Sequence, residues 1–465
     1  ISGGGGSGGV TPKPPLQAIE PTMSNQDPTT NIPNYLHYIV TPLKIAGCWE
    51  MYPQTDNENE IIVNGIYLAI VLFVLIYPPT AMAVHLYTEW VDIMSSLAKI
   101  ADSLPLIVSL AIISYHALNQ DDLYALVKYM DENFKFHSAA GVTNMTMHRS
   151  CVTARNFWKI YTACTMFSVT MYVIMPVMVH LWTREPIQHW LYMDVTCSPY
   201  IELVFLRSCL VQLFVGLALG QFGVFFASNS ILICGQLDLV CCSLRNARYT
   251  ALLQHGVQHT TLVATHGDIR KDEINSYMYN VAEMKSSVYY DDERLVRIYI
   301  RSHSTDIYNP EYNSATVQAL RDCAAMCQVV NTYKEKFESF VSPLLALRVV
   351  QVTLYLCTLL YAATLNFDMI TVEYLAAVAL DIFIYCYYGN QIIIQADRVS
   401  TAAYQSAWHT MGVQPRRVLL NILLANRRPL VMRAGGFLPM DLHTFLVIIK
   451  TSFSYYTLLV NVNEK

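Results

Sequence analysis

Three ionisable side chains, Arg348, Asp381 and Lys450, lie inside long apolar runs of this sequence. A charge at the centre of a membrane helix costs about 2.5–3.5 kcal/mol on insertion scales, so such residues mark ion paths, proton paths or buried pairs. Residues 348 and 381 fall at similar depth in two apolar runs that a very short turn around Asn366 joins. This arrangement predicts that Arg348 and Asp381 pair directly or through water, and we expect the pair to be structural rather than sensory.

Lys450 lies nine residues into the last apolar run, about 13 Å deep at 1.5 Å per helical residue. A lysine at that depth must meet water or a carboxylate, because it cannot face lipid hydrocarbon. Two interpretations stay open. Lys450 either extends to the cytosolic membrane interface or lines an aqueous path along the last helix.

Patterns for catalysis, metal binding or nucleic-acid binding are absent from the sequence. It contains no HExxH, no GxSxG and no phosphate-binding glycine loop. Cys323 and Cys327 share a helix face but have no His or Cys partner at ligand spacing, which favours buried thiols over a zinc site. The net charge is −5, and no basic stripe alternates with aromatic residues. We therefore predict a protein that is not an enzyme, needs no cofactor and binds no nucleic acid.

The elements that must position the charged residues are membrane helices. Hydrophobic residues make up 54% of the chain and charged residues only 14%, whereas soluble domains carry about 25% charged residues. A spanning helix needs about 20 mostly apolar residues. The sequence therefore predicts an all-α integral membrane protein with seven transmembrane helices. The expected spans are 62–84, 97–118, 157–182, 201–229, 343–365, 368–389 and 441–461.

The segments outside these spans are more polar. We interpret residues 1–9, ISGGGGSGG, as a flexible linker added for expression. Residues 10–61 form an N-terminal segment in which 35–52 is typical of an amphipathic or re-entrant helix at the cytosolic face. The segments 230–342 and 390–440 are long and charged. We expect them to supply a cytosolic anchor region, with helical patterns at 323–340 and 413–428.

Lysine and arginine are distributed unevenly along the chain. If the N-terminus is inside, 23 of the 30 fall in cytosolic segments, as the positive-inside rule requires. Seven spans then place the C-terminus outside, the reverse of a G-protein-coupled receptor. The triplet at 397–399 (Asp-Arg-Val) is similar to a motif of those receptors, but it follows the sixth span rather than the third. We therefore expect no G-protein partner.

Three local patterns resemble the insect odorant receptor family. The run YCYYGN at 385–390 is similar to the family's Tyr-Cys-x-x-Gly-Asn pattern, and the helical stretch 413–433, with RRPL at 427–430, resembles its cytosolic anchor helix. The run KTSFSYYTLL at 450–459 matches the family's Lys-x-x-x-Ser-Tyr-x-x-Leu-Leu ending. Related gustatory receptors end in a Thr-Tyr-x5-Gln-Phe pattern, which this chain lacks.

The resemblance implies an odorant-gated, non-selective cation channel in the plasma membrane of a sensory neuron dendrite. Such a channel is a tetramer, and this chain would be the odorant-tuning subunit that assembles with the shared odorant coreceptor, or alternatively a homotetramer. A gustatory-type receptor and, with less support, a small-molecule transporter are the alternatives. The implied organisation is an odorant-binding bundle at 62–229, transmembrane helices at 343–389 and a pore-lining helix at 441–465.

The resemblance also implies functional residues. The gate of the family falls on Leu458, Asn461 and Val462, and Lys450 lies earlier on the same helix as a further pore residue. Apolar side chains four apart share one helical face and can close a pore by dewetting. The odorant pocket would lie in the outer half of the second, third, fourth and sixth spans, where an apolar, aromatic-lined cavity suits small volatile ligands. The residues expected there are Leu104, Val108, Val169, Tyr172, Val173, Met175, Phe205, Cys209, Ile370 and Tyr374.

Overall fold

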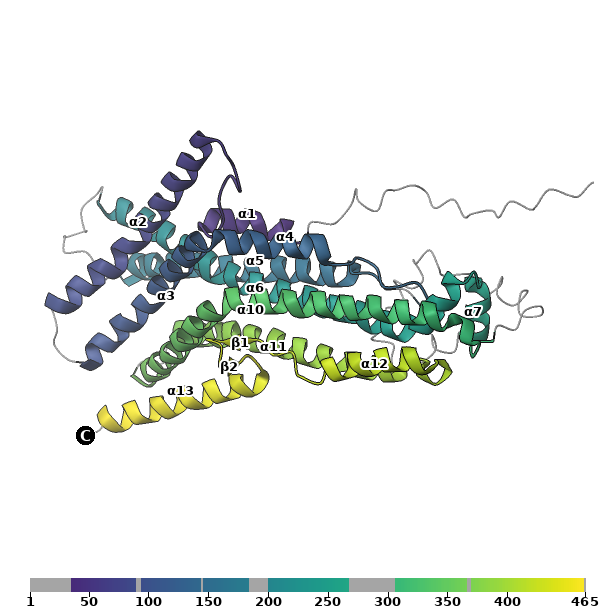
Figure 1. The fold of residues 1–465 in the computed structure, drawn as a ribbon. Coiled ribbons are helices and arrows are strands. Elements are labelled where there is room, and N and C mark those ends of the chain that lie inside the picture. The colour runs from purple at the N-terminus through teal and green to yellow at the C-terminus, as the bar shows by residue number, and fades with distance from the viewer. Residues whose placement is uncertain are drawn as a thin grey trace, which may run out of the picture. The chain divides into compact units, whose positions relative to one another are not determined.

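The computed structural model describes residues 35–88, 93–143, 145–183, 200–266, 306–365 and 369–463. In these ranges the regular structure is helical apart from two strands of two residues each (Figure 1). The elements are α1 (His37–Ala46), α2 (Glu58–Thr88), α3 (Ile93–Leu118), α4 (Gln120–Asn133), α5 (His148–Thr183), α6 (Tyr200–Gln254), α7 (His259–His266), η3 (Pro310–Tyr312), α10 (Asn313–Leu365), α11 (Met369–Gln405), η4 (Trp408–Thr410), α12 (Val413–Ala425), β1 (Arg433–Ala434), β2 (Leu438–Pro439) and α13 (Leu442–Asn463).

The predicted spans coincide with seven separate helices, α2, α3, α5, α6, α10, α11 and α13. Several of these helices continue well past the apolar run. The helix α6 has 55 residues and α10 has 53, so much of the described part of 230–342 is helix rather than loop. The helical patterns predicted at 323–340 and 413–428 lie in α10 and α12, although α12 ends at Ala425. The all-α prediction is therefore confirmed, with longer helices than hydropathy alone indicates.

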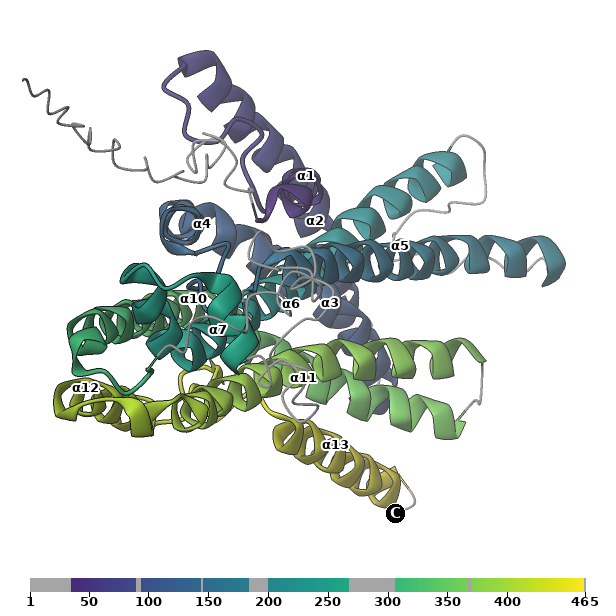
Figure 2. The ribbon, with the colours of Figure 1, turned by 90° about the vertical axis from the view of Figure 1, so that its right-hand side faces the viewer.

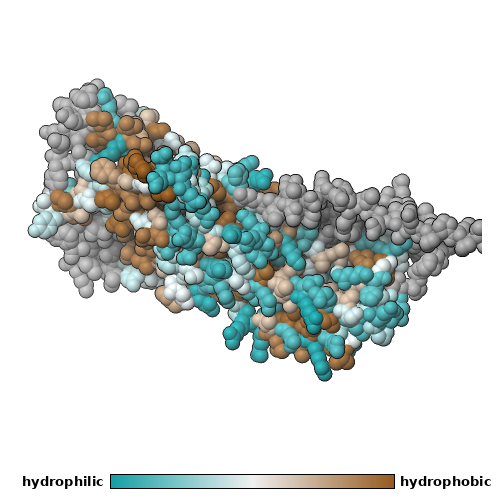
Figure 3. All heavy atoms as spheres, turned by 45° about the horizontal axis from the view of Figure 1, so that its top comes forward, coloured by the Kyte–Doolittle hydropathy of each residue, from teal (hydrophilic) through white to brown (hydrophobic). Residues whose placement is uncertain are grey.

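Four helices are long and apolar enough to cross a membrane when only the described residues are considered. They lie at Glu58–Thr88, Glu202–Gln254, Pro310–Leu360 and Leu375–Gln405, and Ser103–Leu118 is a shorter apolar helix. Of these, α2 exposes the most apolar surface. Its exposed side chains include Ile62, Ile66, Ile70 and Phe73, and hydrophobic residues gather over this part of the surface in Figure 3. A surface of this kind matches lipid rather than water.

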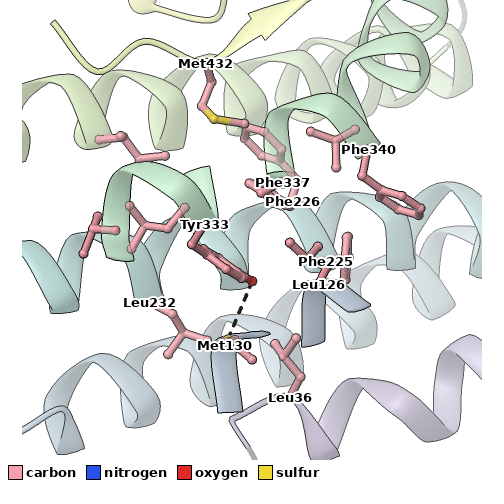
Figure 4. Packing of buried hydrophobic residues seen from close by; sticks show 14 of the residues in the cluster. Leu36, Leu126, Met130, Phe225, Phe226, Leu232, Tyr333, Phe337, Phe340 and Met432 are labelled. Atoms are coloured by element: carbon pink, nitrogen blue, oxygen red, sulfur yellow. Dashed lines mark hydrogen bonds between the residues drawn. The ribbon is translucent and has the colours of Figure 1, made fainter. Parts of the chain in front are cut away.

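The core of the described chain is built around α6 and α10. Helix α6 packs against α1, α2, α3, α5, α10 and α11, and α10 also contacts α4, α12 and α13. Aromatic rings fill the contact between α6 and α10, and the rings of Phe226 and Phe337 stack with centroids 5.8 Å apart (Figure 4). The buried hydroxyl of Tyr333 donates a hydrogen bond to Asn229, and the sulfur of Met130 lies 3.6 Å from the same oxygen. This packing fixes the long helices relative to one another.

The amphipathic helix expected within 35–52 is α1. Its apolar face is buried through Ile39, Leu43 and Ala46, and it packs against α6. The helix ends at Ala46, and Gly47 caps it with a left-handed φ of 77°, a conformation that glycine reaches without steric cost. The helix is therefore part of the packed protein in addition to any contact it makes with the membrane surface.

A small β-hairpin connects α12 to α13. Strand β1 pairs antiparallel with β2, and the turn between them places Gly435 and Gly436 at φ of 61° and 78°. The two glycine N–H groups donate hydrogen bonds to the carbonyl and the hydroxyl of Ser342, at 3.0 and 2.9 Å. The hairpin, which the sequence-based prediction did not include, is thereby attached to α10 and fixes where α13 begins.

The last helix packs on α10 and α11 (Figure 2). Ile448 and Ser452 are buried on the contact side, and Ser452 donates a hydrogen bond to the backbone carbonyl of Thr353 on α10 at 3.4 Å. The other side of α13 exposes Leu446 and Phe453. One face of α13 is therefore covered within the chain, and the other is open to lipid, water or another subunit.

Candidate functional site

A pocket of about 260 Å³ lies among five of the long helices, α3, α5, α6, α10 and α11. Its lining is contributed mainly by consecutive turns of α5 and α6 and by short stretches of α10 and α11. The lining residues are Pro105, Tyr161, Cys164, Thr165, Ser168, Val169, Tyr172, Gln212, Val215, Gly216, Leu219, Gly220, Arg348, Gln351, Val352, Tyr355, Ala377, Val378, Leu380 and Asp381.

The close approach of α5 and α6 shapes one side of this pocket. Gly216 and Gly220 are four residues apart on α6, and a Cβ added at Gly220 would lie 2.8 Å from the Thr165 methyl group on α5. A Cβ added at Gly216 would clash with Val169. Small residues at this spacing let helix backbones pack closely in membranes. The two glycines thus set which turns of α5 and α6 meet and where the pocket lies.

The walls of the pocket are mostly apolar. Val215 and Leu219 come from α6, Val352 from α10, and Val378 and Leu380 from α11. Val352 is buried, and Val378 is half-buried and packs against the main core. Aliphatic walls of this kind favour small apolar molecules, since burying apolar surface contributes about 25 cal/mol per Å².

Four polar side chains form one side of the pocket, which we call the polar floor: Tyr161, Arg348, Gln351 and Asp381. The guanidinium of Arg348 forms an ion pair with Asp381 and donates a hydrogen bond to the side-chain carbonyl of Gln351. The Tyr161 hydroxyl donates to the other carboxylate oxygen of Asp381 at 3.0 Å. The two side chains predicted to pair are therefore in direct contact, and both are buried.

Of the ten residues predicted to bind ligand, Val169 and Tyr172 line this pocket. Five other described residues do not line it: Val108 is buried, Leu104, Val173 and Cys209 are half-buried, and Phe205 is exposed. The side chains of Met175, Ile370 and Tyr374 lie outside the described residues. The pocket uses positions about seven residues further along α6 and α11 than predicted, which corresponds to about 10 Å along a helix.

Sequence reasoning missed the contribution of α10 to the pocket and the role of the glycines. The Gly216 and Gly220 pair was visible in the sequence as a small-xxx-small pattern inside an apolar run. It identifies the turns at which α6 approaches a neighbour, whereas hydropathy identifies only the span. The polar floor was visible in part, because Arg348 and Asp381 were predicted to pair.

The residues predicted for the pore lie on α13. Lys450 is exposed and makes no ion pair within the part of the chain that the structure describes. The side chains of Leu458, Asn461 and Val462 lie outside the described residues, although their backbone continues α13. Val447 and Ser454 share the helical face of Leu458 by spacing, and both are exposed.

The family model described as 7tm Odorant receptor matches residues 98–453. This chain belongs to the insect odorant receptor family. The family consists of multi-pass membrane receptors and not of enzymes. The matching model is that of odorant receptors, in agreement with the branch that the sequence patterns indicate.

Relatives and a solved structure agree with this assignment. Odorant receptor 85e of Drosophila melanogaster is 23% identical over 367 residues, 76% of this chain and 74% of that protein. Odorant receptor 83a of the same species is 23% identical over 74% of this chain and 75% of its own length. The olfactory receptor OR5 of Machilis hrabei in complex with eugenol has a similar fold, with a TM-score of 0.67 and 16% identity over 92% of this chain and all of that one. The seven-helix membrane fold is thereby confirmed.

Proposed function

We propose that this odorant receptor is a subunit of a ligand-gated, non-selective cation channel that opens when a small volatile odorant occupies the pocket described above. One observation carries the proposal: helix α10 joins the pocket to the last helix. Val352 lines the pocket, and the carbonyl of its neighbour Thr353 accepts the hydrogen bond from Ser452 on α13. A ligand that displaces the α10 wall therefore acts on α13 within one helical turn. Gating requires that the ligand bind the open state more tightly than the closed state.

The pore is assigned to α13 in a tetramer with the odorant coreceptor, or alternatively in a homotetramer. The face that does not contact α10 is open in the single chain and is available to a pore and to neighbouring subunits. In this arrangement Leu458 and Val462 form the hydrophobic gate and Asn461 offers neutral polar groups to the permeating ion. The N-terminus is cytosolic, the C-terminus is extracellular, and the membrane is that of the sensory dendrite.

Filling the pocket tests the ligand site. Val378→Phe adds a ring inside the 260 Å³ pocket, so we expect odorant-evoked current to fall at least tenfold at a fixed odorant concentration. The matched control is Val350→Phe, because Val350 is exposed on α10 and lies outside the pocket lining. Both variants are expressed with the coreceptor in oocytes and recorded by voltage clamp, with surface biotinylation to correct for expression. Equal losses in the two variants would place the ligand elsewhere.

Shortening the gate residue tests the pore. Leu458→Ala removes an apolar side chain from each copy of the constriction, so water and ions enter more easily. We expect a standing cation current in the absence of odorant, several times larger than in the wild-type channel. The measurement is the holding current before odorant is applied, with Leu203→Ala as the control because Leu203 is exposed on α6, outside the last helix. A channel that stays closed with Leu458→Ala contradicts this gate.

A further inference from the structure

A second pocket, of about 450 Å³, lies between the α1–α2 connection, the first turns of α2 and the junction of α3 with α4. We call it the junction pocket. It shares no lining residue with the pocket of the candidate functional site. Its lining contains four aromatic side chains and two carboxylates: Trp49, Tyr52, Tyr67, Tyr124, Glu50 and Asp121. Aromatic rings combined with carboxylates suit a ligand that carries a positively charged group.

The charge of the junction pocket is negative. Glu50 and Asp121 line it, and its lining contains no lysine, arginine or histidine. One oxygen of Glu50 accepts a hydrogen bond from the Tyr124 hydroxyl at 2.8 Å. Neither carboxylate forms an ion pair within the part of the chain that the structure describes. The ammonium group of Lys44 donates instead to the backbone carbonyl of Met51 at 2.7 Å. The two carboxylates therefore have no cation of the lining to balance them.

The tyrosines of this pocket offer a ligand their rings, because their hydroxyls are already used. The Tyr67 hydroxyl donates to the carbonyl of Ile45 at 2.6 Å, and the Tyr124 hydroxyl donates to Glu50. The rings of Trp49 and Tyr124 pack edge to face with centroids 5.4 Å apart. An ammonium group over the face of such a ring gains about 0.5–2 kcal/mol. The lining therefore provides the elements of an aromatic cage for an ammonium group.

Hydrogen bonds hold the α1–α2 connection, which forms the rim of the junction pocket. The backbone N–H of Tyr52 donates to the side-chain oxygen of Asn64 on α2 at 3.1 Å, and the Asn64 amide donates back to the Tyr52 carbonyl at 2.9 Å. The N–H of Cys48 donates to the carbonyl of Leu43 at 3.0 Å. The rim is therefore formed without a ligand, which lowers the entropic cost of binding one.

The junction pocket opens beside the exposed apolar surface of α2. Ile61 lines the pocket and is 53% exposed, and Ile62 and Ile66 continue the exposed apolar surface of the helix. The first predicted span begins at residue 62, so the pocket lies at the level of the phospholipid headgroups. A soluble amine would leave this apolar surface uncovered. A phospholipid can place its ammonium group in the pocket and its acyl chains along α2.

We propose that the junction pocket binds the ammonium headgroup of a zwitterionic phospholipid, which is phosphatidylcholine or phosphatidylethanolamine. The ammonium group lies among the aromatic rings and beside Glu50 and Asp121, and the acyl chains lie against Ile61 and Ile66. Phosphatidylglycerol, which has an anionic headgroup without an ammonium group, is repelled by the two carboxylates. The bound lipid connects the start of α2 to the junction of α3 with α4, so it stabilises the packing of the first membrane helix.

Lipid retention by the purified receptor tests the ligand class. The full-length chain is purified in detergent, and native mass spectrometry measures how much of each lipid it retains. Phosphatidylcholine, phosphatidylethanolamine and phosphatidylglycerol with the same acyl chains are added at increasing concentrations. We expect at least one of the two zwitterionic lipids to be retained at a concentration about tenfold below that of phosphatidylglycerol. Equal retention of the three lipids would overturn the proposal. Displacement of phosphatidylcholine by an equal concentration of free choline would overturn the assignment to a lipid.

The double variant Glu50→Gln with Asp121→Asn tests the carboxylates. It removes both charges but leaves an acceptor for the Tyr124 hydroxyl, and we expect retention of the zwitterionic lipids to weaken about tenfold. The matched control is Glu58→Gln with Asp122→Asn. Both control residues are exposed in the first turns of α2 and α4 and lie outside the pocket lining, so retention should stay within about twofold of the wild type. Equal retention by the two double variants contradicts the site.

The variant Tyr52→Ala tests the aromatic rings. Tyr52 is 46% exposed, and its hydrogen bonds to Asn64 use only the backbone, so the fold should be kept. We expect phosphatidylcholine to be lost more than phosphatidylethanolamine, because a quaternary ammonium group donates no hydrogen bond and depends on ring contacts. An unchanged melting temperature without lipid identifies a folded variant, and unchanged retention of phosphatidylcholine by it would refute the cage. These measurements need neither odorant nor current, so they succeed or fail independently of the proposed function.

Discussion

Replacing Asp381 by asparagine is expected to destabilise the membrane domain by about 3–5 kcal/mol, because it leaves the charge of Arg348 buried without its partner. The two side chains form an ion pair, and Arg348 is 4% exposed. Asparagine can still accept a hydrogen bond from Tyr161, but it carries no charge to balance the guanidinium. Most of the receptor should then fail to reach the cell surface. Surface biotinylation and thermal melting in detergent, followed by size-exclusion chromatography, measure the two effects.

The same substitution at Asp397 is the matched control. Asp397 lies on the same helix, α11, and is exposed, so Asp397→Asn should change stability by less than about 0.5 kcal/mol. A double variant, Arg348→Met with Asp381→Leu, removes both charges and should recover much of the lost stability, since apolar replacements of a buried pair are often tolerated. If Asp381→Asn melts and traffics like Asp397→Asn, the pair has no structural role.

This pair was predictable from sequence because a charge inside an apolar run is tightly constrained. A lone arginine at that depth is costly, so the sequence must supply a carboxylate at a similar depth on a neighbouring helix. The short connection near residue 366 makes α10 and α11 neighbours in the chain, and the two helices pack together in the structure. The similar depth of the two residues and the adjacency of their helices could therefore both be predicted from the sequence. The additional partners of the pair, Tyr161 and Gln351, could not be predicted, because they depend on how the helices are rotated about their axes.

The location of the pocket was not predictable to within one helical turn. Hydropathy marks a span of about 20 residues but does not say which turn of one span meets which turn of the next. Here that register is set by Gly216 and Gly220 against Thr165 and Val169.

The extension of α6 to Gln254 was missed for a related reason. Its last turns are helical because residues such as Leu244 and Leu252 are buried in tertiary contacts, and that burial is not apparent from the composition of the segment.

Replacing Gly389 by alanine is expected to be the second most damaging change. Gly389 lies in the YCYYGN run on α11, and a Cβ added there would fall well inside van der Waals contact with the backbone carbonyl oxygen of Met440. Met440 is fully buried, and its N–H donates to the carbonyl of Met432 at 2.8 Å. The backbone at Met440 therefore cannot move without disturbing the hairpin that precedes α13. Overpacking of this kind costs about 1–3 kcal/mol, and the shift of α13 should also reduce odorant-evoked current.

Gly65→Ala is the matched control, because it shows the effect of alanine in a helix without any contact of the added methyl group. Gly65 lies within α2 and has no atom within 4 Å of an added Cβ. Alanine is a better helix former than glycine by about 0.8–1 kcal/mol, so Gly65→Ala should raise the melting temperature slightly. Gly389→Ala gains the same intrinsic preference and should nevertheless lower it. The difference in melting temperature between the two variants therefore measures the close packing of α11 on the chain leading into α13, and similar melting temperatures would show that Met440 has room to move.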